Sequence, residues 1–392
     1  MDKIKINSPY LRFNGFEDVL QQYDLNSIST HRKGNGIPKN EIDNNGVFPC
    51  IRYGELYTIY NEVIWLINSK TNIKNKVESS GNEILIPSSG EKKRDISRCS
   101  ALTVENVAIG GDINLIKINQ QFSNIFIALQ IAHKKWKNIY MMSQGDSVVH
   151  VSWSQIKKII LFIPELIEQT KIANFFTLLD KQIQLMERKL ELYELRKKYY
   201  LNNMLKYIFD NGEKISMKEL FIEKNISPID NLTGYTPISI KLHGKGFKES
   251  TLNVKLSKGG RRYYERLPGD IVIGLQNFHN GSIGILPDSF IKPIMSNAII
   301  SFDVKKVNKL LMVEYFLSEK FLFHLRNISE GTGQKEFSKK NILDLEYFII
   351  DQKIEESFSK FLFLSIEGIN SIKKQKDQLT KRKTYYLNNM FV

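Results

Sequence analysis

Residues 164–204 read PELIEQTKIANFFTLLDKQIQLMERKLELYELRKKYYLNNM and decide the fold of the chain. Apolar residues recur in this stretch at alternating steps of four and three, the a/d seam of a long helix that packs against another helix. Pro164 suits a first helical turn, and Asn211 with Gly212 supplies a stop. A helix of this length spans roughly 60 Å, so it needs a long partner. The seam consists of Ile172, Phe176, Leu179, Ile183, Met186, Leu190 and finally Tyr193.

The chain repeats this helix near its end. The sequence YYLNNM begins at Tyr199 and again at Tyr385, and we call the difference in numbering, 385 minus 199 or 186, the repeat offset. The same offset carries Lys197 onto Lys383, so the recurrence includes a polar interruption of the seam. A duplicated long helix explains this pattern, and two such helices most simply pack antiparallel. The second seam has the apolar members Phe358, Leu362, Ile369, Ile372 and Leu379, with Ser365 and Lys376 between them.

Composition limits the class of protein. With 392 residues, of which 42% are hydrophobic, the chain can form two domains with cores of their own. The two cysteines, Cys50 and Cys99, indicate a reducing compartment and argue against a disulfide framework or a cysteine metal cluster. The first residues lack a signal-peptide pattern, and no apolar run is long enough to span a membrane. We therefore expect a cytoplasmic protein without a membrane segment.

The charge of the chain points to a polyanionic partner. The net charge is +14 and the isoelectric point is near 9.4. Residues 1–206 and residues 207–392 each hold 28 Lys+Arg and 21 Asp+Glu, so each half carries +7. Equal shares favour two modules with equivalent electrostatic roles, whereas a basic tail would concentrate the excess. A lysine-rich solvated surface is the alternative.

The predicted order is domain, helix, domain, helix. We expect a first domain over residues 1–162, a spacer helix over 163–206, a second domain over 207–349 and a C-terminal spacer helix over 350–392. The fold class is α+β: two mixed α/β domains joined by two long antiparallel coiled-coil helices, as a pseudo-two-fold repeat. This arrangement would place the domains at opposite ends of the helix pair.

The two domains match in the order of their patterns. YTPISIKLHG from Tyr235 takes the place of FPCIRYGELY from Phe48, and GDIVIGLQNF from Gly269 that of NEILIPSSGE from Asn82. A predicted helix near residues 311–326 corresponds to one near residues 121–137. Further correspondences are SEGTG from Ser329 with SQGDS from Ser143, and predicted strands at 342–350 with those at 156–163.

At this point the sequence resembles a known family, the DNA-specificity subunits of type I restriction-modification systems. The resemblance covers essentially the whole chain. Its most specific part is the segment from Ile163 together with the recurrence of the long helix. The segments that carry it are SPYLRFNGFED from Ser8, GVFPCIRYGELY from Gly46, ILIPSSGE from Ile84 and IPELIEQTKIANFFTLLDKQI from Ile163.

The resemblance implies a non-catalytic DNA-recognition subunit. Each domain would be a target-recognition domain that reads half of a bipartite site in double-stranded DNA. The helices would fix the distance between half-sites and bind two methyltransferase subunits, and motor and restriction subunits would join this core. No cofactor is expected in this subunit, because S-adenosylmethionine would be bound by the methyltransferase.

The second copy of the helix departs from the first at its beginning. Ile350 stands where the first copy has Pro164, and Ile354 with Glu355 replaces the Glu168–Gln169 pair. The resemblance therefore leaves open whether the second helix begins and binds its partner in the same way.

Basic and aromatic residues in the first domain are candidates for contacts with DNA. Phosphates require cations, and base edges require planar or amide donors. Lys134, Lys135 and Lys137 around Trp136 are typical of a helix end near phosphate. A solvated surface role is the alternative for each single residue. The main candidates are His31, Arg32 and Lys33 in a loop, Arg52 and Tyr53 after a strand, and Lys92, Lys93, Arg94 and Arg98.

The second domain contains a more concentrated basic stretch. Residues 241–266 hold eight Lys+Arg and two Glu. Gly259 and Gly260 would allow the backbone to approach phosphate. Gln276 and Asn277, with His279, follow an apolar strand and could reach base edges or cap the loop. The candidates within the stretch are Lys241, His243, Lys245, Arg261, Arg262, Tyr263, Tyr264 and Arg266.

Catalytic motifs are largely missing from the sequence. It has no GxxxxGK[ST] phosphate loop, no GxGxxG that opens a helix, no paired His/Cys metal spacing and no adenine-methylation motif of the Asn/Asp-Pro-Pro-Tyr type. A motor or a methyltransferase would need one of these. Asp288, Asp303 and Lys305 have the layout of a metal-dependent nuclease, which is one alternative. The other is a coiled-coil scaffold without preference for any DNA sequence.

Overall fold

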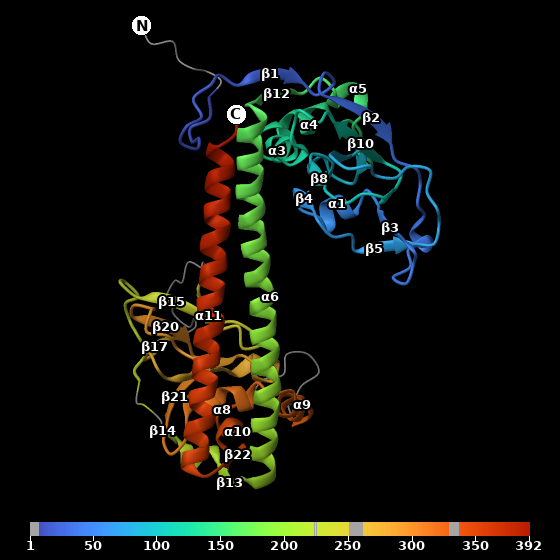
Figure 1. Ribbon diagram of the computed structural model, residues 1–392. Coiled ribbons are helices and arrows are strands. Elements are labelled where there is room, and N and C mark those ends of the chain that lie inside the picture. Colours follow the sequence, from blue (N-terminus) through green and yellow to red (C-terminus); the bar gives the residue numbers. More distant parts are fainter. Residues whose placement is uncertain (1–7, 223, 225, 251–261, 329–336) are drawn as a thin grey trace. The chain divides into compact units, whose positions relative to one another are not determined.

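The computed structural model describes residues 8–222, 224, 226–250, 262–328 and 337–392. The chain forms two compact units. The first unit consists of Met1–Glu187 with Lys374–Val392, and the second is Arg188–Lys373. Each unit contains one α+β domain and a segment of each long helix (Figure 1). Each long helix is thus divided between the two units, whereas the sequence suggested that each helix forms a separate segment between or after the domains.

The first domain is built on a five-stranded sheet in the order β2-β10-β6-β8-β4. Strand β6 is buried along its whole length, and β10 is buried except at one residue. Short apolar runs of this kind are typical of strands that are covered on both faces. The strands are β2 Ser29–Lys33, β4 Val63–Ile64, β6 Glu83–Pro87, β8 Ser100–Leu102 and β10 Ile113–Ile118.

Smaller sheets complete the first domain. The order β5-β3-β9 forms a three-stranded sheet, in which β3 pairs antiparallel with β5 and parallel with β9. Two further antiparallel pairs are β1-β12 and β7-β11. The bounds are β1 Gln21–Asp24, β3 Phe48–Ile51, β5 Ser69–Thr71, β7 Ser89–Gly90, β9 Ala108–Ile109, β11 Val149–His150 and β12 Ile160–Ile163.

A broken helix covers the large sheet of the first domain. Helix α3, Asn124–Gln130, packs against β6 and β8. Ser123 caps it by accepting a hydrogen bond from the backbone of Phe126. A π-helical turn, η2 (Ile131–Lys135), leads on into α4 (Trp136–Met142). The shorter helices are η1 Lys39–Glu41, α1 Glu55–Thr58, α2 Lys93–Ile96 and α5 Trp153–Ile156.

The second domain repeats this sheet topology. Its sheet β14-β21-β18-β19 has the same order as β2-β10-β6-β8, and β15 pairs antiparallel with β16 and parallel with β20, as β3 does with β5 and β9. The proposed equivalence of YTPISIKLHG with FPCIRYGELY is thereby confirmed at the level of strands. The bounds are β14 Phe221–Ile222, β15 Thr236–Ile240, β16 Phe247–Glu249, β17 Tyr263–Glu265, β18 Ile271–Gly274, β19 Ile283–Ile285, β20 Pro293–Ser296 and β21 Ile299–Val304.

The helices of the second domain also follow the first. Helix α8, Lys309–Phe316, begins after the cap residue Asn308 and packs against β19. The helix predicted near residues 311–326 is divided into α8 and α9, Glu319–Ile328. The shorter helices are α7 Met217–Leu220, η3 Leu275–Asn280 and α10 Lys339–Leu343. The SEGTG segment from Ser329 lies outside the described residues.

Each long helix is entered from a strand at the same point of the repeat. Strand β12 ends at Ile163, and α6, Leu166–Asn211, follows. Strand β22, Glu346–Ile349, pairs with β13, Glu213–Ser216, and leads into α11, Gln352–Asn389. Leu166 and Gln352 are separated by the repeat offset, so the second helix begins at the equivalent residue although Pro164 is replaced there.

One contact of the first helix turn has no counterpart. The carboxylate of Glu168 is 2% exposed and forms an ion pair with Arg12 at 2.5 Å. Ile354 occupies the equivalent position of α11. The replacement of Glu168 by Ile354 in the second copy therefore removes the carboxylate of this ion pair, whereas the helix still begins at the equivalent residue.

The two helices pack antiparallel in each unit. In the first unit the rings of Phe175 and Tyr386 contact each other at a centroid distance of 5.0 Å. In the second unit Phe361 and Tyr200, their equivalents at the repeat offset, contact each other at the same distance of 5.0 Å. All the apolar a/d residues named from the sequence are buried or half-buried, except Tyr193, which is 36% exposed. The seam is therefore confirmed.

Several predicted bounds were wrong. Helix α6 runs to Asn211, where the sequence places the helical stop, and so extends beyond the boundary of the spacer helix predicted at residue 206. The strand predicted over 156–163 is confined to β12, because α5 occupies the preceding residues. The strand predicted over 342–350 is likewise β22 alone, preceded by α10.

Candidate nucleic-acid interface

His31, Arg32 and Lys33 lie on strand β2 and not in the loop that the sequence suggests. The imidazole of His31 stacks on Trp153 with ring centroids 4.7 Å apart. Burial lowers the pKa of His31, so its imidazole is neutral at neutral pH. Arg32 forms an ion pair at 2.8 Å with the fully buried Glu83. Lys33 is exposed and is the cation of this group that is most open to an anionic partner.

Helices α2 and α4 pack against each other and gather cations around aromatic rings. The guanidinium of Arg94 lies 3.8 Å from the ring centroid of Trp136, and Lys137 lies 5.8 Å from the same centroid. Lys93 lies 5.9 Å from the ring of Tyr140, which is 42% exposed. These contacts hold the cations at the surface by cation–π attraction. We name this group the α2–α4 cluster: Lys92, Lys93, Arg94, Trp136, Lys137 and Tyr140.

The other basic residues near this cluster differ in their surroundings. Arg98 is exposed after α2. Lys134 donates a hydrogen bond to the carbonyl of Asn388 at 2.8 Å, within the first unit. Lys135 is half-buried over the ring of Phe162, and burial lowers its pKa. Lys134 and Lys135 therefore have structural contacts, and Lys137 is the member of the trio that stays with the α2–α4 cluster.

Arg52 and Tyr53 line a cleft of about 300 Å³ at the end of strand β3. The Nε of Arg52 donates a hydrogen bond to the carbonyl of Ile37 at 3.2 Å. Gly110 and Gly111 form part of the wall, so the cleft is bordered by backbone as well as side chains. A cleft with one arginine and one tyrosine can present donors and an aromatic face to a ligand.

Lys241, His243 and Lys245 are exposed in the turn between β15 and β16. His243 has a φ of 59°, a left-handed conformation, and its backbone N–H donates to the carbonyl of Asn280. Gly244 donates in the same way to Gly281. The turn is thus fixed against the end of η3, and its two lysines are exposed at the surface.

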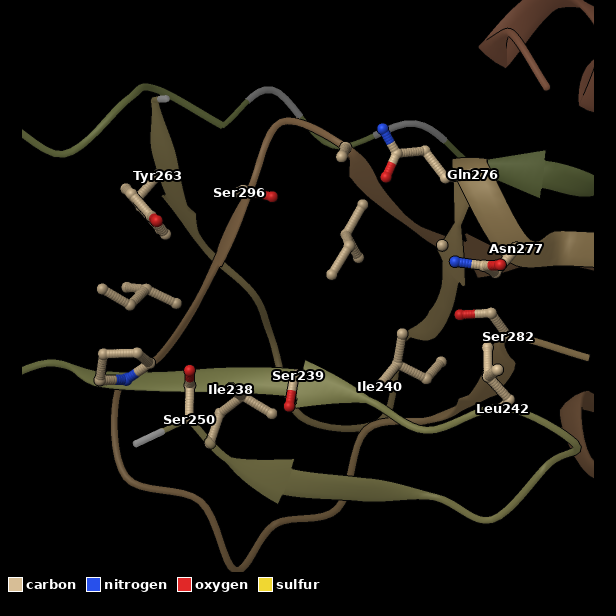
Figure 2. A pocket seen from close by; sticks show the side chains of 15 residues that line it. Ile238, Ser239, Ile240, Leu242, Ser250, Tyr263, Gln276, Asn277, Ser282 and Ser296 are labelled. Carbon is tan, nitrogen blue, oxygen red and sulfur yellow. The ribbon is translucent and has the colours of Figure 1, made fainter. Parts of the chain in front are cut away.

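Strand β15 also borders a groove of about 240 Å³ in the second domain. Tyr263 lies on one side, Gln276 and Asn277 lie on the other, and Ser239 lies between them (Figure 2). Three of the predicted residues are therefore brought together from β17 and η3. Sequence reasoning missed the hydroxyls of the groove, because isolated serines resemble ordinary loop residues. These hydroxyls belong to Ser239, Ser250, Ser282 and Ser296.

Arg266 is a structural residue in this domain. It is 4% exposed, and its guanidinium donates hydrogen bonds to the carbonyl of Ile299 and the hydroxyl of Ser301. Burial lowers its pKa to about 10. The ring of Tyr264 lies 5.4 Å from the guanidinium. Arg266 is therefore unsuited to reading bases, contrary to its place in the basic stretch.

Of the other predicted residues near Arg266, the structure describes some and not others. Arg262 is exposed, and its carbonyl accepts a hydrogen bond from the backbone of Asn297. Arg261, with Gly259 and Gly260, lies outside the described residues. The structure therefore describes residues 241–250 and 262–266 of the basic stretch.

Asp303, which the sequence suggested as a nuclease residue, is paired with lysines. The carboxylate of Asp303 forms ion pairs with Lys309 at 2.7 Å and Lys224 at 3.8 Å. The hydrogen bond from Lys309 lowers the pKa of Asp303. Two lysines thus neutralise this carboxylate. Within the described ranges, no group of three or more His, Cys, Asp or Glu residues could hold a metal ion.

Comparisons with known proteins agree with the domain repeat. Residues 18–194 match the family model of the type I restriction modification DNA specificity domain. No curated protein matches the sequence. The chain is similar in fold to the type I restriction-modification S subunit from M. genitalium, with 14% identity, a TM-score of 0.66, and coverage of 98% of this chain and 99% of that chain.

Two further solved structures are similar over nearly their full length. One is the HsdS subunit from Thermoanaerobacter tengcongensis, with 12% identity, a TM-score of 0.44 and coverage of 98% of each chain. The other comes from a study of complex assembly and conformational transition of the type I R-M system, with 11% identity, a TM-score of 0.48, and coverage of 96% of this chain and 98% of that chain.

These findings define the class of the first domain. It matches a DNA specificity domain, and the second domain repeats its sheet topology. The family model covers the first domain and much of α6, and the second half repeats the same elements in the same order. The chain therefore contains a type I restriction modification DNA specificity domain over residues 18–194. No helix in the described part of the chain combines the length and the apolarity of a membrane span.

Proposed function

We propose that this subunit reads a bipartite site in double-stranded DNA, with one half-site for each domain. The observation that carries the proposal is the recurrence of strand order and helix contacts in the two halves of the chain. It gives one chain two recognition domains of the same kind. The subunit would act in the cytoplasm and bind no cofactor of its own, since S-adenosylmethionine belongs to its methyltransferase partner.

The α2–α4 cluster supports DNA binding by the first domain. Arginine and lysine held beside the half-buried ring of Trp136 and the exposed ring of Tyr140 suit phosphate contacts and stacking. Helix α4 also packs against α5, whose Trp153 stacks on His31, so the cluster is linked to strand β2 by direct contacts. Lys33 extends the basic character along that strand.

The groove of the second domain supports direct reading of bases. An amide side chain such as that of Gln276 or Asn277 can form two hydrogen bonds with an adenine edge. Tyr263 faces these amides across the groove (Figure 2) and offers an aromatic surface. Lys241 and Lys245, in the turn after β15, add cations for phosphate.

Replacement of both Gln276 and Asn277 by alanine is expected to relax one half of the methylated motif. Each good base contact contributes about 1–3 kcal/mol of discrimination. The measurement is co-expression with the methyltransferase, followed by sequencing of methylated adenines in host DNA. Asn202 and Asn203, exposed on α6, provide the matched alanine control. Unchanged specificity in both halves would remove these amides from the site.

The same experiment tests the proposed function as a whole. A single bipartite motif for the unaltered complex is the expected result. A stable complex with no motif would favour a coiled-coil scaffold that binds proteins without preference for any DNA sequence.

We propose further that two methyltransferase subunits dock on the helices, and that motor and restriction subunits join this complex. In the first unit Leu178 and Tyr385 are 60% and 52% exposed. In the second unit their equivalents at the repeat offset, Leu364 and Tyr199, are 58% and 64% exposed. Exposed apolar side chains that recur in both copies suit two copies of one partner.

Substitution of Leu178 by aspartate is expected to remove one methyltransferase copy, and Leu364→Asp the other. A charge in an apolar interface is costly because it loses its hydration without gaining a partner. Native mass spectrometry of the purified complex gives the stoichiometry. Val47→Asp, at a residue of the first domain that is 74% exposed, is the control. Retention of two copies in both helix variants would contradict the docking site.

A further inference from the structure

Two lysines at equivalent positions of the long helices bind carboxylates of the two recognition domains. Lys383 of α11 places its Nζ 3.1 Å from Glu62, in the segment between α1 and β4. The same Nζ lies 2.7 Å from Asp180 of α6. The side chains of Lys383, Glu62 and Asp180 are only 14%, 23% and 16% exposed. One cation therefore connects both helices to the domain of the first unit.

Lys197 has the same role in the second unit. It is the equivalent of Lys383 at the repeat offset, and its Nζ lies 2.5 Å from Glu314 on α8. The two side chains are 22% and 13% exposed. Glu62 and Glu314 come from different elements of their domains, a loop in one and a helix in the other. The helix position is thus the same, whereas each domain supplies the carboxylate from its own structure.

The charges around Lys383 hold the ion pairs together. Burial alone would raise the pKa of Glu62, but a hydrogen bond with His133 and the charge of Lys383 outweigh it and lower that pKa. Burial would lower the pKa of Lys383, yet Glu62 and Asp180 raise it overall. Lysine and glutamate are therefore both charged at neutral pH. Removal of one member leaves a poorly solvated charge, which is costly.

A second contact recurs at the other end of each helix segment. Gln169 of α6 accepts a hydrogen bond through Oε1 from the backbone of Ser123, the cap residue of α3, at 2.9 Å. Glu355, the equivalent of Gln169 on α11, accepts one from Asn308, the cap residue of α8, at 3.0 Å. Each domain thus has two polar contacts with the helix pair, beside the hydrophobic contacts of its core with both helices.

We propose that Lys383 and Lys197 are positioning residues that fix the orientation of each recognition domain on the helix pair, and thereby the spacing between half-sites that the subunit accepts. This inference rests on the proposed function. Loss of either lysine leaves a poorly solvated carboxylate without its cation, so we expect the domain to shift its orientation while its hydrophobic contacts keep it on the helices. We expect the bases read in each half-site to stay unchanged, because neither lysine lines the groove or belongs to the α2–α4 cluster.

The test compares Lys383→Met and Lys197→Met with Lys381→Met and Lys198→Met, which remove exposed lysines of the same helices. Each complex is expressed with the methyltransferase, and methylated adenines are mapped in host DNA. For the first two variants we expect unchanged half-sites, but an increase of about tenfold in methylation at spacers one base pair longer or shorter. The two controls keep the spacer of the unaltered subunit.

A charge exchange separates positioning from a general loss of stability. Lys197→Glu combined with Glu314→Lys restores the ion pair in reverse, and we expect it to restore the original spacer, whereas Lys197→Glu alone does not. If Lys383→Met fails to fold, the Lys197 pair decides the question. Unchanged spacer selectivity in folded variants, or an exchange that folds without restoring the spacer, would overturn the inference. Absence of any motif for the unaltered complex would instead overturn the proposed function.

Discussion

Deletion of one heptad from each long helix is expected to shorten the spacer of the DNA site and leave both half-sites unchanged. Removal of residues 185–191 and 371–377 keeps the a/d register, because seven residues are one repeat of the seam. Seven helical residues correspond to about 10 Å, which is about three base pairs of DNA. Sequencing of methylated adenines from the co-expressed complex gives the new spacer.

The matched control for this deletion removes two residues from each helix, 185–186 and 371–372. Two residues turn a helix by about 200°, which rotates the following seam residues to the opposite face, so we expect the helix pair and methylation to be lost. If the heptad variant instead methylates the original site, the length of the helices does not set the spacer, and the geometric part of the proposed mechanism is wrong.

Replacement of Phe176 by alanine is expected to destabilise the first unit by about 3–5 kcal/mol. Phe176 is fully buried, and its ring lies 5.3 Å from Phe175 and 5.7 Å from Phe391 near the chain end. Its loss leaves a cavity where α6, α11 and the domain meet. Thermal unfolding together with hydrogen exchange gives both the size and the location of the effect.

Phe363→Ala is the control for this substitution, because Phe363 is 57% exposed on α11. Its loss is expected to change stability by less than about 0.5 kcal/mol. Equal effects of the two substitutions, or increased exchange outside the first unit for Phe176→Ala, would show that Phe176 does not hold the helices to the domain.

The helical repeat could be predicted from the sequence because its information is local and occurs twice. The steps of four and three locate the buried face, and the identity of YYLNNM sets the register. The structure places Leu166 and Gln352, the first residues of α6 and α11, at the repeat offset. The end of α6 at Asn211 also follows from a local signal, the glycine that comes next.

The candidate site could be predicted only as groups of residues. Arg266 stands in a run of basic and aromatic residues, yet its guanidinium is held by Ile299 and Ser301, which lie far along the chain. No local pattern distinguishes this buried arginine from an exposed one. Glu62 and Lys383 are separated by 321 residues. The recurrence of Lys197 as Lys383 was the available signal for that ion pair, because a polar residue repeated within an apolar seam requires a partner.

The repeated ring contact makes the helix sequence self-complementary. Phe175 of α6 contacts Tyr386 of α11, which is the counterpart of Tyr200. Tyr200 of α6 contacts Phe361 of α11, which is the counterpart of Phe175. Each copy therefore supplies both halves of the joint. Exchange of one domain between related chains would leave this joint intact, so the helix pair itself would need no change.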